Sequence, residues 1–498
     1  MKNDKNPYIL LKERTLERVT ELYSCDNLLC KSLTYCRDCM QETGGVNLKK
    51  INASIKRFWG ISEIGFSFMA TMETSFFILF LTDVARLPLA MVAVITGFSG
   101  IADAVTAVLA GAIIDKTTFK NGKYRPWLIY CPPIVVIFFI LMFTKIGTNL
   151  SAAVICSIGY IVSHGVWNIA WTANRAMIGS LSDDPKERAF LSGRIAAGSS
   201  GGKIVASYLV PVLTTAFLGL FMGAGQSWGY TITAAIASLV FTITYFVHYQ
   251  ITKGYDRPEE YAGVSKKSVT LMDMLKAIVT NPQLLILLVA DALRLIGFYM
   301  IAACAAFYTK IVLENPSATS IILVIFNAGT LVGSLMSKQI VAKLGTKKAS
   351  ILGTGGLAVF LVLLYFMPSS QALVFVILFV AQTIFGVAYG LTTSMYSMCG
   401  TDSEYRTGKD TKGVIMACSS LAIKIAIALR GIVISAALAA IAYDPDAAVT
   451  SAAQGGIKLV FLIIPAVFSI ASVVMFLLYR IKDSDIEKME QEIAKRRA

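Results

Sequence analysis

Residues 113–127 read IIDKTTFKNGKYRPW, a charged stretch between two long apolar runs. Five of these fifteen residues are charged: Asp115, Lys116, Lys120, Lys123 and Arg125. The Asn121-Gly122 pair favours a tight turn, and Pro126 suits the first turn of a helix. Because an apolar run of about 20 residues can cross a membrane as a helix, the stretch predicts a short polar connection between two membrane-spanning helices.

The composition of the whole chain agrees with this interpretation. Of its 498 residues, 56% are hydrophobic and 15% are charged, and the mean hydropathy is +0.66. Soluble domains usually carry about 25% charged residues. A soluble fold could not remove this much apolar surface from water, because its surface is too large relative to its volume. The chain is therefore predicted to be a polytopic membrane protein.

Twelve apolar segments are long enough to span a membrane as helices. They are expected at about residues 59–83, 88–114, 126–145, 151–178, 192–222, 228–250, 283–311, 317–341, 348–367, 371–396, 412–441 and 456–480. No segment shows the short alternating pattern of a membrane β-strand. The predicted fold class is an all-α membrane protein with twelve transmembrane helices.

Basic residues gather in the loops that follow even-numbered spans, whereas the odd loops are nearly free of them. Loops rich in Lys and Arg stay in the cytoplasm. We therefore expect a multi-pass protein of the cytoplasmic (inner) membrane with both termini in the cytoplasm. This bias also explains the formal net charge of +14, so no nucleic-acid partner is expected.

The basic turn recurs in the second part of the chain. Lys116 lies 57 residues after Trp59, and Lys343 lies 59 residues after Leu284. Such a repeat is typical of transporters with two six-helix halves. The halves are expected at 58–250 and 283–482, joined by a cytoplasmic linker at 251–282 that contains a short amphipathic surface helix. A charged cytoplasmic tail follows at 483–498.

Residues 1–57 form a separate cytoplasmic extension. Its first part has an amphipathic helical pattern, and four cysteines follow: Cys25, Cys30, Cys36 and Cys39. The final C-x-x-C pair suits zinc ligation by thiolates. Because the first spacing is loose and no His lies nearby, reduced thiols are favoured over a zinc site. No cleavable signal peptide is visible at the charged start.

A longer pattern, D-x7-G-x3-D-K-T…N-G-K-Y-R-P-W, runs from Asp103 to Trp127. TDV at 82–84, DDPKER at 183–188 and EYRTGKDTKG at 404–413 accompany it. Together they closely resemble the glycoside–pentoside–hexuronide:cation symporter family, a branch of the major facilitator superfamily, from about residue 58 to the end. The resemblance implies cation-coupled symport of a sugar, a glycoside or a similar small polar solute by alternating access.

The resemblance also implies a cytoplasmic latch, in which charged loops form ion pairs that hold the two halves together in one state. The members would be Asp115, Arg125 and Arg188, with Asp402 and Glu404 as candidate partners. Such pairs must stay weak if both states are to be populated. A purely topogenic role for the basic residues is the alternative.

Charged residues inside a membrane are costly unless they face protein or water. Asp103, Asp291, Arg294, Lys203 and Lys424 lie well inside their spans, and Glu73 is also deep. Each is therefore a candidate for a functional site.

The cation site is predicted at Asp103 and Thr106, which share a helix face. The resemblance places the coupling cation there and Lys424 beside it, free to pair with Asp103 when the cation is absent. A second aspartate of the family is replaced by Ala107. A lone buried carboxylate can bind and release a proton. Proton coupling is therefore favoured over sodium, with uniport left open and a purely structural pair as the alternative.

The substrate site is less clearly marked. The family holds its sugar with two aspartates, and the first position aligns with Ser67. The second falls in HGVWNIAWTANRAM, residues 164–177. Hydrogen bonds and aromatic faces for a sugar could come from four residues of this segment: Trp167, Asn168, Trp171 and Asn174. Asp291 and Arg294 either line the substrate path or neutralise each other.

The sequence supports other functions less well than it supports transport. The only histidines are His164 and His248, and no metalloprotease or other hydrolase motif is present, so an intramembrane enzyme is not expected. Two six-helix halves suit alternating access better than a channel. A uniporter or a transport-inactive solute sensor remains the alternative. The expected partners are a small-molecule substrate, a coupling H+ or Na+ and membrane lipid, with no other cofactor and a monomeric state.

Overall fold

The computed structural model describes residues 51–182, 184–220, 226–258, 271–408 and 411–497. The amphipathic pattern predicted near the N-terminus lies outside these residues. So do the four cysteines of the weak zinc candidate: Cys25, Cys30, Cys36 and Cys39. The described part contains no group of three or more His, Cys, Asp or Glu residues that could hold a metal ion.

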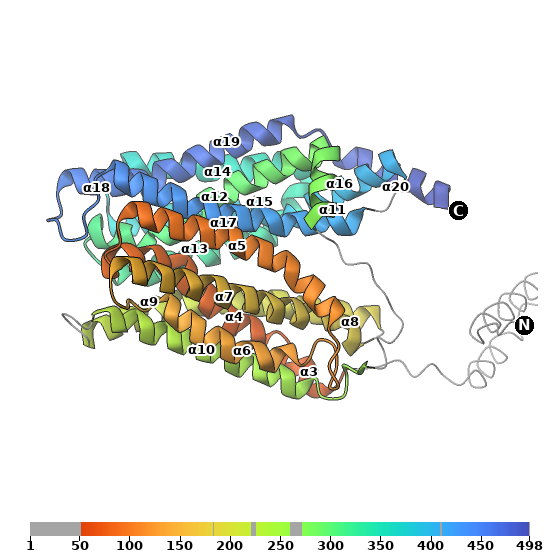
Figure 1. Ribbon diagram of the computed structural model, residues 1–498. Helices are drawn as coiled ribbons and strands as arrows, with labels where there is room; N and C mark the ends of the chain where they lie inside the picture. The colour runs from red at the N-terminus through yellow and green to blue at the C-terminus, as the bar shows by residue number, and fades with distance from the viewer. Residues whose placement is uncertain (1–50, 183, 221–225, 259–270, 409–410, 498) are drawn as a thin grey trace, which may run out of the picture. The chain divides into compact units, whose positions relative to one another are not determined.

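The first half of the chain is a group of six long helices, which lie together in the lower part of Figure 1. They are α4 (Ile61–Leu79) with the π-helical turn η1 (Phe80–Val84), α5 (Leu89–Lys116), α6 (Trp127–Met142), α7 (Asn149–Ala176), α9 (Pro185–Leu220) and α10 (Gln226–Ile251). Two short helices accompany them: α3 (Ala53–Phe58) and α8 (Ile178–Leu181).

The second half repeats this arrangement in the upper part of Figure 1. Its long helices are α12 (Pro282–Ile311), α13 (Ala318–Leu344), α14 (Thr346–Phe366), α15 (Gln371–Gly390), α17 (Lys412–Ala440) and α18 (Ser451–Lys458) continuing through η4 (Leu459–Ile463) into α19 (Ile464–Leu478). Three further helices lie at the end from which the 113–127 turn projects: α11 (Leu271–Thr280), α16 (Thr392–Thr407) and α20 (Asp483–Arg497).

Within the described residues, each of the twelve expected spans contains a helix. Eleven are long and apolar enough to cross a membrane. The third, α6, is apolar but has only 16 residues and contains Pro132 and Pro133. In the described part of the chain the only β contact is an isolated bridge between Phe119 and Gly122 in the 113–127 turn. The predicted all-α membrane fold is therefore confirmed.

The outer surface of the bundle is apolar. Along α5, exposed side chains recur every three or four residues: Val94, Phe98, Ile101, Val105 and Leu109. This spacing places them on one helix face, and such a stripe is compatible with lipid rather than with water. The most enclosed of the long helices are α4 and α12, because 72% of the residues in the apolar stretch of each are buried. They form the centre of their respective halves.

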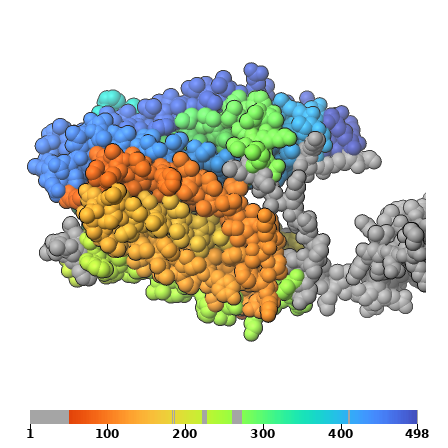
Figure 2. Space-filling model, in the orientation of Figure 1, coloured from red at the N-terminus to blue at the C-terminus, as the bar shows by residue number. Residues whose placement is uncertain are grey.

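The two halves meet along a seam between α5 and α17, which we call the α5–α17 seam. A Cβ added to Gly100 of α5 would lie 2.6 Å from the Cα of Ala428 on α17, so the two backbones are in close contact there. Toward the 113–127 turn α5 diverges from α17 in Figure 1, and a Cβ on Gly111 would meet no atom within 4 Å. Figure 2 shows the two halves in contact along this line. The seam is therefore closed at one end and open at the other.

The seam can be tested by enlarging one glycine at each end. We expect Gly100→Leu to lower the thermal stability of the protein in detergent, because overpacking a filled contact costs about 1–3 kcal/mol. Gly111→Leu, on the same helix but at the open end, is the matched control and should unfold at the wild-type temperature. Thermal unfolding followed by tryptophan fluorescence measures both, and a Gly100→Leu protein as stable as wild type would contradict the close contact.

Candidate functional site

Two buried ion pairs join the halves in the middle of the bundle. Lys424 Nζ on α17 lies 2.6 Å from Asp103 Oδ2 on α5. Arg430 Nη2, also on α17, lies 2.6 Å from Glu73 Oε1 on α4. Both carboxylates and Arg430 are buried. Because a buried charge without a partner is strongly destabilising, each pair holds one helix of the first half against one helix of the second.

Asp103 has a second partner in Asn168 of α7. The Asn168 amide donates to Asp103 Oδ1 at 2.8 Å, and its carbonyl oxygen accepts from Lys424 Nζ at 3.3 Å. Thr106 donates to the backbone oxygen of Asp103 and lies 3.5 Å from the Asn168 amide. The three residues predicted for the cation site are thus brought together. Asn168, which the sequence assigned to the substrate, lies at this site as well.

The pair of Glu73 and Arg430 was not predicted. Glu73 had been recognised as deep in its span, but no partner was assigned to it. The signal for one was present in the sequence, since Arg430 lies within the apolar residues of α17. Its guanidinium also lies 5.8 Å from the ring centre of Tyr299 on α12, a distance compatible with a cation–π contact. Arg430 therefore contacts helices of both halves.

Aromatic side chains line one face of α7. Trp167 stacks on His164 with ring centres 4.5 Å apart, and Phe66 of α4 packs edge-on against Trp167 at 4.8 Å. Trp171 carries the Arg175 guanidinium 4.0 Å above its ring. The indole Nε1 of Trp171 is buried, yet it has no acceptor among the described residues. An unpaired buried donor beside aromatic rings is the kind of group that a polar ligand can satisfy.

Two residues of the predicted substrate set have their polar atoms occupied inside the first half. Ser67 is fully buried and donates to the backbone oxygen of Glu63 at 2.6 Å. Asn174 is also fully buried, where its amide nitrogen donates to Ser62 and its amide oxygen accepts from His248 Nδ1 at 2.8 Å. These bonds hold α4, α7 and α10 together. The structure therefore gives no support to a substrate role for either residue.

Asp291 and Arg294 form a pair within α12. The Arg294 Nε lies 2.8 Å from Asp291 Oδ1, and both side chains are fully buried. The guanidinium also donates to the Ala388 backbone oxygen and to Thr392, and Tyr396 donates to Asp291. Of the two alternatives left by the sequence, mutual neutralisation is the one that this arrangement favours, because each charge is satisfied inside the second half.

The closed end of the seam carries two further ion pairs between the halves. Lys310 Nζ lies 2.6 Å from Asp83 Oδ2, and Arg86 lies 2.6 Å from Asp446. The Tyr443 hydroxyl donates to both oxygens of Asp83. Burial, and then the neighbouring Asp83 carboxylate, raise the pKa of Tyr443, so its hydroxyl remains a donor at neutral pH. The TDV segment noted in the sequence is thus part of this closed end.

The residues of the predicted latch lie at the open end. Asp115 pairs with Lys123 at 3.1 Å, and Arg125 donates to the Tyr249 backbone oxygen. Asp402 pairs with Arg406. These partners lie in the same half as the residue that they contact. None of the contacts described for Asp115, Arg125 and Asp402 bridges the two halves.

Arg188 and Glu404 complete the predicted latch. Arg188 donates to the backbone oxygens of Ser182 and Gly179, and Glu404 lies 3.3 Å from Lys412. The contacts described for them are also local. A latch between the halves stays a prediction, and it would require a state in which the open end is closed.

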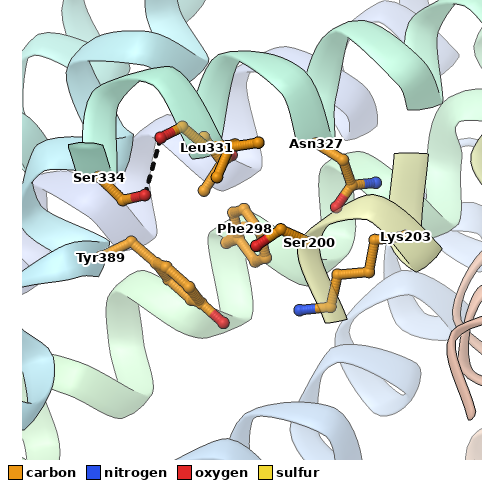
Figure 3. A pocket seen from close by; sticks show the side chains of 8 residues that line it. Ser200, Lys203, Phe298, Asn327, Leu331, Ser334 and Tyr389 are labelled. Carbon is orange, nitrogen blue, oxygen red and sulfur yellow. Dashed lines mark hydrogen bonds between the residues drawn. The ribbon is translucent and has the colours of Figure 1, made fainter. Parts of the chain in front are cut away.

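A pocket lies between α9 of the first half and the helices of the second (Figure 3). The space in it that is not filled by protein atoms measures about 380 Å³, a figure that includes open solvent at its mouth. Residues of four helices line it: Ser200, Lys203, Phe298, Asn327, Thr330, Leu331, Ser334 and Tyr389. The predicted substrate set contained none of these residues.

A two-half bundle with ion pairs across its seam can be compared with known proteins. A family model described as MFS/sugar transport protein matches residues 58–483. The chain belongs to this family. The resemblance to glycoside–pentoside–hexuronide:cation symporters and the prediction of a transporter rather than an enzyme are confirmed.

Relatives of this transporter are similar over most of their length. The putative glycoside/cation symporter YagG of Escherichia coli (strain K12) is 23% identical over 447 residues, which cover 88% of this chain and 94% of the relative. The putative sulfoquinovose importer of the same organism is 25% identical over 468 residues, covering 90% and 95%. The solved structure of the nucleoside transporter NupG has a TM-score of 0.61 at 14% identity, covering 86% of this chain and 99% of its own.

The cross-half pair of Arg430 and Glu73 predicts a specific pattern of stability. We expect Arg430→Met alone to cost about 3–5 kcal/mol, because it leaves Glu73 buried without a partner. The double variant Arg430→Met with Glu73→Met should recover most of this loss, since two apolar side chains can replace a buried pair. Thermal unfolding in detergent compares the three proteins. A double variant no more stable than Arg430→Met would mean that the two residues are not coupled.

Proposed function

We propose that this transporter carries a sugar, a glycoside or a similar small polar solute together with a proton that binds Asp103. The observation that carries the proposal is the contact between Asp103 and Lys424 across the seam. In this contact the ammonium group of Lys424 occupies the place that a bound cation would take. A cation on Asp103 would compete with Lys424 and weaken one of the bonds between the halves.

Competition of this kind couples the cation to a change of state. A two-state protein responds to a ligand only if the ligand interacts differently with the two states. When Asp103 is protonated, its attraction to Lys424 is lost, while Asn168 can still bond the neutral acid. Release of Lys424 then favours another state, in which α5 and α17 move apart at the closed end of the seam.

The donor set at Asp103 favours a proton over sodium. Sodium prefers several oxygen ligands, as hard cations do. One carboxylate, the Asn168 amide and the Thr106 hydroxyl offer fewer charged oxygens than a site with two aspartates. Proton binding needs only the carboxylate. A sodium-dependent uptake that does not acidify the vesicle interior would overturn this choice of ion without overturning symport.

The proposed site for the solute is the space between the halves, with the aromatic face of α7 as one of its walls. Trp167 and Trp171 offer flat apolar surfaces, and sugars commonly bind such faces with a few convergent polar groups. The unpaired indole Nε1 of Trp171 is the donor proposed to contact a sugar hydroxyl.

The proposed location is the cytoplasmic membrane, with both termini in the cytoplasm and the protein acting as a monomer. The charged turn at 113–127 and the other basic loops would then lie in the cytoplasm. In this orientation the pair of Asp83 and Lys310 faces outward and the open end faces inward. The apolar stripe on α5 would contact lipid. The structure would then represent an inward-open state.

Asp103→Asn is the first test of the coupling mechanism. In vesicles containing the purified protein and a pH-sensitive dye, the variant should lose solute-dependent acidification and concentrative uptake, because asparagine cannot bind and release a proton. Glu490→Gln, which removes an exposed carboxylate on α20, is the control and should behave as wild type.

The same assay distinguishes the alternatives. Concentrative uptake by Asp103→Asn would exclude Asp103 as the coupling residue. Movement of solute down its gradient only, in the wild-type protein, would indicate a uniporter. Solute binding without any movement would indicate a sensor.

Trp171→Phe tests the solute contact. The variant keeps an aromatic face but lacks the indole N–H, so it should lose one hydrogen bond to the solute. Such a bond contributes about 0.5–1.5 kcal/mol, and we expect a half-saturation constant for uptake raised by up to about tenfold. The maximal rate should change little. An unchanged half-saturation constant would show that the indole donor does not contact the solute.

A further inference from the structure

Lys203 is a charged residue of a membrane-spanning helix for which the described residues show no partner. It lies near the middle of α9, where a lysine is costly unless it is paired or faces water. Within the described residues, four carboxylates in membrane-spanning helices each face a basic residue: Glu63 with Arg175, Glu73 with Arg430, Asp103 with Lys424 and Asp291 with Arg294. Lys203 has neither an ion pair nor a hydrogen bond with any residue described in the structure.

The surroundings of Lys203 do not supply a spare negative charge. Its electrostatic field reaches Glu63, but both oxygens of Glu63 already accept from Arg175 at 3.2 Å. One carboxylate thus stands near two cations. Among these three described groups, one positive charge is left without a counter-charge.

The pocket next to Lys203 can receive a polar molecule. Figure 3 shows the Lys203 amine and the Tyr389 hydroxyl pointing toward the same open space, with Ser200 beside them. Nor does the described part of the chain offer a hydrogen-bond partner to the hydroxyl of Ser200 or of Tyr389. The rings of Phe298 and Tyr389, with centres 5.5 Å apart, form an aromatic wall. One cation, two free hydroxyls and a flat apolar surface suit a small organic anion that also carries hydroxyl groups.

We propose that the solute bears one negatively charged group, a carboxylate, sulfonate or phosphate, and that Lys203 binds this group in the pocket between α9 and the second half. The proposal rests on the proposed function and makes it more specific, since it assigns a charge to the solute and a residue to that charge. The anion would complete the charge balance that the protein leaves open. It would also connect the two halves, because Lys203 belongs to the first and Tyr389 to the second.

The first experiment needs no ligand. Lys203→Met should leave the thermal stability of the full chain in detergent unchanged or higher, because it removes an unpaired charge from the membrane interior. This is the opposite of the result expected for Arg430→Met. Lys338→Met, which replaces an exposed lysine one turn beyond Ser334 on α13, is the matched control. A Lys203→Met protein destabilised as strongly as Arg430→Met would overturn the proposal, since Lys203 would then have a structural partner.

The second experiment uses matched solutes. The purified protein in a neutral detergent is titrated with glucose, glucuronate, glucose 6-phosphate and 6-deoxyglucose 6-sulfonate, and binding is followed by tryptophan fluorescence. At least one acidic sugar should bind the wild-type protein, and it should bind Lys203→Met at least about tenfold more weakly. The reason is that losing a hydrogen bond between charged groups lowers the affinity by more than about tenfold. Lys203→Arg should retain most of the affinity, and glucose should bind weakly to all variants.

The outcomes separate this proposal from the proposed function. The anion site is overturned if glucose binds the wild-type protein as strongly as every acidic sugar does. It is also overturned if no acidic sugar binds the wild-type protein. Solute-dependent acidification that requires Asp103 but is unaffected by Lys203→Met keeps symport and overturns the anion site. Anionic lipid, added in micelles, is a further ligand to test. If it binds and no acidic sugar does, Lys203 binds a lipid headgroup, and the assignment to a solute is overturned.

Discussion

Charge buried in the bundle must be paired, and the arrangement of the two halves depends on how this requirement is met. Asp103 on α5 and Lys424 on α17 lie in different halves, and neither could remain charged in a membrane without the other or a substitute. Their contact therefore brings the two helices together. The small residues around Gly100 allow the backbones to approach closely enough for the pair to form. Asn168 then fixes the orientation of both groups.

In the proposed mechanism, the same requirement would allow the halves to move. A bond made of complementary charges is lost when one charge is neutralised, whereas an apolar contact persists. The pairs at the closed end, Asp83 with Lys310 and Arg86 with Asp446, are partly exposed to water and therefore contribute little to stability individually. The deeper pairs contribute more, and in the proposed mechanism the pair of Asp103 and Lys424 is the one that a cation weakens.

Within each half the polar contacts are of another kind. Asp291 with Arg294, and Asn174 with Ser62 and His248, connect helices of one half only and have no group from the other half among the partners described. They stabilise the packing inside each half and do not depend on the contact between the halves. Lys203 differs from both classes, because its charge is not balanced by protein. A binding residue can be left unsatisfied in this way at a modest cost in stability, since the ligand supplies the missing charge.

Composition and hydropathy were sufficient to predict the all-α membrane fold, the positions of the long apolar helices and most of their bounds. These depend on local physics, namely the length of helix needed to cross a bilayer and the cost of placing charges in it. The depth of each charged residue within its span was also predictable. It identified four charged residues as candidates for a functional site: Asp103, Lys424, Glu73 and Lys203. The short α6 was not predicted, because apolar residues continue beyond Met142 although the helix ends there.

The partner of each buried charge was decided only by the tertiary structure. In a membrane the outward face of a helix is as apolar as its inward face, so hydropathy does not show which way a side chain points. Asn168 was assigned to the solute but lies against Asp103, and Ser67 was assigned to the solute but packs inside the first half. Arg430 and Glu73 are separated by 357 residues of sequence. The sequence by itself determined which groups are buried in the membrane, and the packing of distant helices decided which of them meet.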